Sequence, residues 1–128
     1  MNKKMLCEDL MNKGFENSNF CDFVKTFDNI PLYLKVYSNL FGKITTLGII
    51  YKFENILEEK YHDEVWDKCI ELIDKNDQYL KIGSLGFEFI ETDILNREYL
   101  NNIDSNLIEY YCEFFAKQIK PLLKKYNI

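Results

Sequence analysis

Residues 44–57 read ITTLGIIYKFENIL, and the fold of the chain depends on how this apolar stretch is built. The Ile-Ile-Tyr run inside it is short, and alone it could form a buried strand. Ile44, Leu47 and Tyr51, however, are spaced by three and then four residues, which matches one face of a helix. The spacing therefore predicts a buried helix over residues 43–60.

A helical period recurs along most of the chain. Glycines and prolines are few, and the hairpin dipeptides Asn-Gly and Asp-Gly do not occur. The other expected helices are at 3–12, 19–28, 31–41, 64–75, 85–95 and from about 105 onward, with a short turn of helix at 77–82. The sequence thus predicts an all-α fold, with residues 1–128 forming a single compact domain of six or seven helices. The alternative is an α/β fold with strands at 46–53 and 85–90.

The composition narrows the class of protein. At 128 residues with 47% hydrophobic residues, the chain is long enough for one domain with a core. Its pI of about 4.9 argues against direct nucleic-acid binding, because phosphate contacts need positive surface. No run of 18 apolar residues is present, so no membrane partner is expected.

The cysteines and the start of the chain indicate the compartment. The four cysteines form no C-x-x-C pair, and Glu8 and Asp9 interrupt the apolar residues that a signal peptide would need. We therefore expect reduced cysteines and a cytoplasmic location.

Charge is sorted along the chain. Residues 54–113 contain sixteen acidic and five basic residues, whereas residues 117–128 contain four lysines and no acid. A surface of one sign attracts an oppositely charged partner and accelerates its docking. We therefore predict that acidic side chains bind a basic protein partner. The predicted partner-binding residues are Glu58, Glu59, Asp63, Glu64, Asp67, Glu71, Asp74, Glu88, Glu91 and Asp93.

Catalytic and metal-binding alternatives have weaker support. His62 is the only histidine, and although Glu58 precedes it by one helical turn, a zinc site needs three or four ligands. A cysteine nucleophile would need His62 as its base, and Cys69 is two helical turns away on the expected apolar face. We predict no catalytic residue, no metal and no cofactor.

One segment resembles a known class of protein. A Trp66-led helix runs to Leu72-Ile73, and after a turn at Gly83 the sequence Leu85-Gly86-Phe87-Glu88 opens a second segment. Residues 66–90 are similar to a pattern in small helical bacterial proteins of the toxin–immunity type. The pattern favours Gly-Pro-Leu-Glu where this chain lacks the proline. The resemblance implies a binding function and no catalytic residue.

These observations lead to one functional hypothesis and two alternatives. The first is a cytoplasmic immunity-type protein, not an enzyme, that blocks a basic toxin, plausibly a nuclease, with its acidic surface. The first alternative is a viral or bacterial interaction protein that binds a partner helix in a groove. The second is a small enzyme that uses His62 or a pair of carboxylates.

Overall fold

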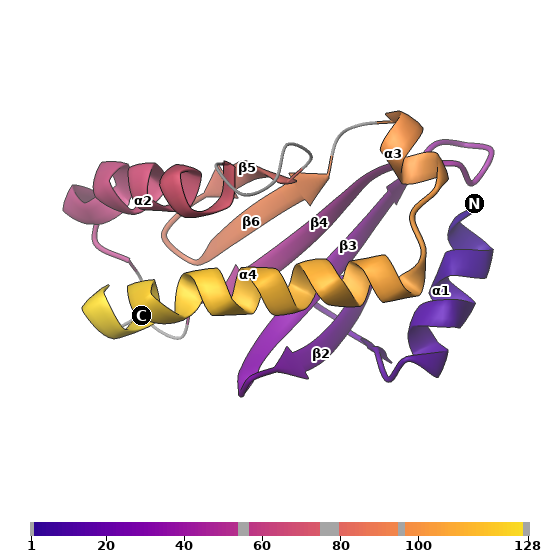
Figure 1. The fold of residues 1–128 in the computed structure, drawn as a ribbon, viewed down its shortest axis with the longest axis horizontal. Helices are drawn as coiled ribbons and strands as arrows, with labels where there is room; N and C mark the ends of the chain where they lie inside the picture. Colours follow the sequence, from indigo (N-terminus) through magenta and orange to yellow (C-terminus); the bar gives the residue numbers. More distant parts are fainter. Residues whose placement is uncertain (1, 54–56, 75–79, 95–96, 127–128) are drawn as a thin grey trace.

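The computed structural model describes residues 2–53, 57–74, 80–94 and 97–126 and has an α+β fold (Figure 1). A six-stranded antiparallel sheet in the order β1-β2-β3-β4-β6-β5 carries helices α2 and α4 on one face. The strands are β1 (Glu16–Asn17), β2 (Phe23–Phe27), β3 (Ile30–Ser38), β4 (Ile44–Lys52), β5 (Leu80–Leu85) and β6 (Phe89–Ile94). The helices are α1 (Lys3–Asn12), η1 (Glu59–Tyr61), α2 (His62–Asp74), α3 (Arg97–Asn101) and α4 (Ser105–Tyr126). The predicted all-α fold of six or seven helices is therefore wrong.

Strand β3 replaces the helix predicted at 31–41. Its residues alternate between the two faces of the sheet, with Ile30, Leu32, Leu34 and Val36 buried and the residues between them more exposed. This period of two is the pattern of a strand with one buried face.

A tight turn joins β2 to β3 and explains why residues 19–28 do not form the expected helix. Asp28 and Asn29 both have positive φ, 51° and 65°, which is the conformation of a type I′ hairpin turn. Asn and Asp tolerate this region better than other non-glycine residues. The Asp-Asn dipeptide thus does here what Asn-Gly does in the commonest hairpins.

A helix was predicted over residues 43–60, but residues 44–52 of this stretch form strand β4. It is central in the sheet, pairing with β3 from Tyr33 to Ser38 and with β6 from Phe89 to Ile94. Leu47, Ile49 and Tyr51 face the helices, but Gly48 and Ile50 are buried as well. A strand with apolar residues on both faces shows little alternation, so a helical spacing fits it equally well.

Strands β5 and β6 also occur where helices were predicted. The prediction of a helix at 85–95 falls on β6, and that at 77–82 falls on β5 from residue 80, with residues 77–79 outside the described part. The strands of the alternative prediction, 46–53 and 85–90, overlap β4 and β6, although that alternative named the α/β class rather than an antiparallel sheet.

Three predicted helices are present. The helix predicted at 3–12 is α1, capped by the Asn2 Oδ1, which accepts a hydrogen bond from the Met5 N–H at 2.9 Å. The helix predicted at 64–75 corresponds to α2. The last helix, α4, is capped by Asp104, whose Oδ1 accepts from the Leu107 N–H at 2.8 Å, and it continues through Pro121.

The hydrophobic core lies between the sheet and helices α2 and α4. The side of α4 that faces the sheet is completely buried and carries Ile108, Tyr111, Phe115 and Ile119, spaced by three or four residues. Leu6 and Leu10 of α1 close the core at one end. The other face of the sheet, called here the open face, carries no helix in the view of Figure 1.

Candidate functional site

Most of the predicted acidic residues lie on one surface, here called the acidic surface. It is formed by the start of η1, by α2 and by the β5–β6 turn, and its members are exposed: Glu58, Glu59, Asp63, Glu64, Asp67, Glu71 and Glu88. Asp74 ends α2, but its side chain lies outside the described ones.

Backbone contacts hold the β5–β6 turn against the start of α2. The Leu57 N–H donates to the Phe87 carbonyl at 3.0 Å, and the Phe53 N–H donates to the Glu88 carbonyl at 2.7 Å. The His62 ring packs on the Phe87 ring with centroids 4.7 Å apart. Glu88 is therefore brought beside the acidic residues that precede and begin α2.

Few of these carboxylates are neutralised. Lys60 pairs with Glu58 at 3.3 Å, and Lys125 of α4 pairs with Glu64 at 3.1 Å. The nearby Tyr126 hydroxyl and the Lys125 ammonium lower the pKa of Glu64. The remaining five members, Glu59, Asp63, Asp67, Glu71 and Glu88, form no ion pair with any other residue in the described ranges.

The last two predicted residues, Glu91 and Asp93, lie elsewhere. Both project from β6 onto the open face, opposite the face that α2 covers, because residues two apart in a strand share a face. Glu91 is buried and Asp93 is half-buried. The structure thus brings seven predicted residues together and separates these two from them.

Glu91 and Asp93 form a carboxyl pair with unusual electrostatics. Burial, the charge of Glu91 and a hydrogen bond to Glu91 raise the pKa of Asp93 from 3.8 to about 7. The Tyr37 hydroxyl donates to Glu91 Oε1 at 3.3 Å, and burial together with both carboxyls raises the pKa of Tyr37 to about 12. Asp93 Oδ1 is buried without a hydrogen-bond partner among the described residues. The pair therefore retains a proton close to neutral pH.

Two glycines provide the room for this pair. A Cβ atom on Gly48 would lie 2.8 Å from Glu91 Oε1, and one on Gly83 would lie 2.1 Å from Asp93 Oδ2. Gly83 falls at the irregularity in the β5–β6 register, between Ile82 and Ser84. Strand glycines commonly mark a bulge or a close approach of another group, and both apply at Gly83.

Substituting Gly83 by alanine is expected to lower the free energy of unfolding by about 1–3 kcal/mol, the usual cost of an overpacked site. The new methyl group must displace the Asp93 carboxyl. Urea unfolding measures the effect. Gly86→Ala is the matched control, because no atom lies within 4 Å of its added Cβ. If the prediction is right, the cost of Gly83→Ala shrinks in an Asp93→Ala background; an unchanged cost would mean that Asp93 is not the obstacle.

An aromatic cluster occupies another part of the open face. The Phe20 ring packs edge-on against Tyr33, with centroids 4.9 Å apart, and against Phe89 at 6.5 Å. Lys52 Nζ lies 4.6 Å from the Phe20 ring centre, within cation–π range. This half of the open face is thus partly closed by the loop that carries Phe20.

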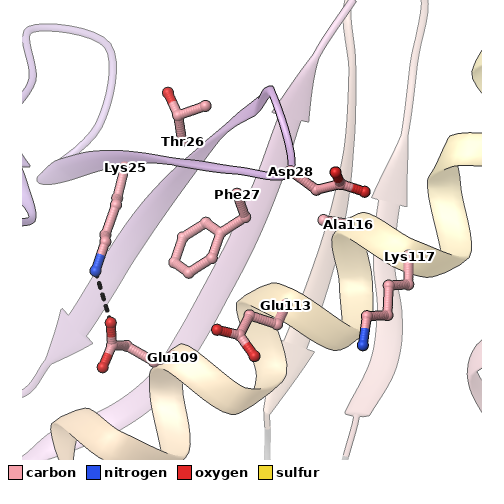
Figure 2. A pocket seen from close by; sticks show the side chains of 8 residues that line it. All are labelled: Lys25, Thr26, Phe27, Asp28, Glu109, Glu113, Ala116 and Lys117. Carbon is pink, nitrogen blue, oxygen red and sulfur yellow. Dashed lines mark hydrogen bonds and ion pairs between the residues drawn. The ribbon is translucent and has the colours of Figure 1, made fainter.

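A pocket of about 360 Å³ lies between the β2–β3 hairpin and α4 (Figure 2). Lys25 and Glu109 form an ion pair of 2.6 Å beside it, and this contact lowers the pKa of Glu109. Asp28, also on the rim, pairs with Lys120 at 2.8 Å. Figure 2 shows Phe27 on the strand side of the pocket and Glu113 on the helix side. None of the predicted acidic residues lines this pocket, and most of its charges are already paired.

Among the described residues, no hydrogen bond joins His62 to a cysteine. Burial raises the pKa of Cys69 to about 12 and that of Cys112 further, so both thiols stay protonated at neutral pH. The Nε2 atom of His62 lies 3.3 Å from the Leu57 carbonyl oxygen. All four cysteines are free, and no group of three metal-ligating side chains occurs among the described residues.

Comparisons with protein families, with curated proteins and with solved structures find no match to this chain. Within the described part of the chain, no helix has the length and apolar character that crossing a membrane requires.

The sequence reasoning missed the surroundings of Glu91 and Asp93. Tyr37, Gly48 and Gly83 come from three other strands, and only the sheet register brings them to the carboxyl pair. The available signal was the alternation in residues 89–94, in which Glu91 and Asp93 fall between Ile90, Thr92 and Ile94.

Proposed function

We propose that this protein is an immunity-type binding protein, which docks a basic protein toxin on its acidic surface and blocks it. The observation that carries the proposal is the set of five exposed carboxylates of the acidic surface that form no ion pair with a described residue. Crowded, unneutralised carboxylates repel one another, and a cationic partner relieves that repulsion.

The mechanism is electrostatic attraction followed by steric blocking. A toxin that acts on nucleic acid has to present positive charge where the phosphates bind. The exposed side of α2 carries several carboxylates, and these would pair with that positive charge in place of the phosphates. The half-buried Trp66 of the same helix adds apolar contact area beside the charges.

The proposal is tested with two variants of equal charge change. In the first, four carboxylates of the acidic surface are replaced by amides: Glu59→Gln, Asp67→Asn, Glu71→Gln and Glu88→Gln. In the matched control, four exposed carboxylates elsewhere are replaced: Glu8→Gln, Asp9→Asn, Glu16→Gln and Glu113→Gln. The binding partner is the purified product of the neighbouring gene, and affinity is measured by calorimetry.

We expect the first variant to bind at least tenfold more weakly, since steering by charge is worth about 10–10³ in association rate. The control variant should bind like the wild type. Equal losses in the two variants would mean that only net charge matters, and an unaffected first variant would remove the acidic surface from the interface.

A further inference from the structure

The β3–β4 turn presents two large apolar side chains to solvent. Leu40 and Phe41 are 101% and 92% exposed, the most exposed of the large hydrophobic residues in the described chain. The central positions of hairpin turns are usually occupied by Gly, Asn, Asp or Ser. Residues 39–43 are called here the hairpin tip.

Hydrogen bonds fix the hairpin tip in this conformation. Asn39 Oδ1 accepts from the N–H groups of Phe41 and Lys43, at 2.9 and 3.0 Å. The Gly42 N–H donates to the Asn39 carbonyl at 3.0 Å, and the φ of Gly42 is 77°, which glycine adopts without strain. These bonds hold the backbone of the tip in the conformation that exposes Leu40 and Phe41.

Three lysines belong to the hairpin tip or to the start of α1, which is hydrogen-bonded to it. The Lys3 N–H donates to the Gly42 carbonyl at 2.8 Å, which holds the start of α1 against the tip. Lys4 and Lys43 are exposed and form no ion pair with a described residue. Lys3 lies 3.9 Å from Asp22, the only carboxylate with which it pairs in the described chain.

The acidic surface lies at the opposite end of the sheet from the hairpin tip. The tip precedes Ile44, the first residue of β4, whereas Lys52 at its other end pairs with Phe89 beside the β5–β6 turn. The eight steps from Ile44 to Lys52 span about 27 Å at roughly 3.4 Å each. This exceeds the Debye length of about 8–10 Å at physiological salt, so the acidic surface contributes little to the electrostatic potential at the tip.

We propose that the hairpin tip inserts Leu40 and Phe41 into the interfacial region of an anionic lipid bilayer, with Lys3, Lys4 and Lys43 against the headgroups. Apolar side chains ringed by lysines are typical of surfaces that bind such membranes. Two side chains on a convex tip offer far less contact area than a stable protein interface needs, whereas a bilayer accepts a protruding group. The proposal departs from the sequence-based expectation of no membrane partner. That expectation rested on the absence of a spanning segment, and a contact of this kind needs none.

Vesicle binding tests the proposal. Wild type and a Leu40→Ser/Phe41→Ser variant are sedimented with phosphatidylcholine vesicles that either contain or lack phosphatidylserine. We expect the wild type to bind only the anionic vesicles, and the variant to bind them at least tenfold more weakly, the effect of losing even one buried apolar side chain. Met11→Ser is the matched control, an exposed apolar side chain outside the tip, and should bind like the wild type.

Insertion is checked separately with a Phe41→Trp variant. Its added tryptophan should shift its emission to the blue on binding and should be quenched by brominated lipid, beyond any change that Trp66 shows in the wild type. Absence of binding to anionic vesicles, or equal binding by wild type and the double serine variant, overturns the proposal. The remaining alternative is that the tip inserts into an apolar pocket of a protein partner. Neither result bears on the acidic surface, because its partner and its variants are different.

Discussion

Replacing Phe115 by alanine is expected to lower the free energy of unfolding by about 3–5 kcal/mol, the usual cost of removing a fully buried aromatic ring. Phe115 is 0% exposed and lies in the middle of α4, on the side that packs against the sheet. The loss combines the hydrophobic transfer of the ring with the cavity that it leaves. Urea unfolding followed by circular dichroism measures it.

The matched control is Tyr110→Ala, an aromatic residue on the same helix that is 57% exposed. An exposed substitution of this kind should change the free energy of unfolding by about 0.5 kcal/mol or less. If the two substitutions had equal effects, α4 would not pack on the sheet with the face that the structure shows.

The second large effect is a pH dependence that Asp93 produces. The pKa of Asp93 is about 7 in the folded protein and 3.8 for an ordinary carboxyl. Between these values the folded protein holds a proton that the unfolded chain has released, so the free energy of unfolding falls as pH rises from about 4 to about 7. Its stabilising contribution is fully present below pH 4 and is lost above pH 7.

An Asp93→Asn substitution should remove this dependence. The variant is expected to unfold at a higher temperature than the wild type at pH 8, where the wild type carries a half-buried charge, and at a similar temperature near pH 4. Asp67→Asn, a substitution of an exposed carboxylate, should follow the wild type throughout. A wild type whose stability is flat between pH 5 and pH 8 would show that the carboxyl pair holds no proton.

The helices were predictable because their apolar periods are unambiguous. In α4, buried residues recur every three or four positions over five turns, and only a helix places them on one face. Asn2 and Asp104 occur where caps are expected, so the starts of α1 and α4 could also be found.

The sheet was not predictable in the same way, because its central strands do not alternate cleanly. In β4, the buried Ile50 lies on the face opposite Ile49 and Tyr51, so the run also satisfies a helical spacing. The alternation in β3 is clear in the structure, yet Leu34, Tyr37 and Phe41 also lie at helical intervals. Which period applies is decided by pairing with strands that are distant in sequence, and local spacing does not contain that information.

The candidate site was predictable to the extent that it lies on a helix. Asp63, Asp67 and Glu71 of α2 are exposed at spacings that a helix places side by side, and this follows from the sequence once α2 is assigned. Glu91 and Asp93 were grouped with them by the helix expected at 85–95. In strand β6 the same residues lie on the side of the sheet opposite α2. The incorrect prediction of a helix at 85–95 therefore assigned residues of two separate surfaces to one.

The most direct test of the acidic surface is the dependence of association rate on ionic strength. The rate constant for binding the product of the neighbouring gene is measured by stopped flow for the wild type and for the two four-residue variants. The proposal predicts a steep fall with salt for the wild type and the control variant, and a much flatter line for the variant of the acidic surface. Equal slopes for all three proteins would contradict it.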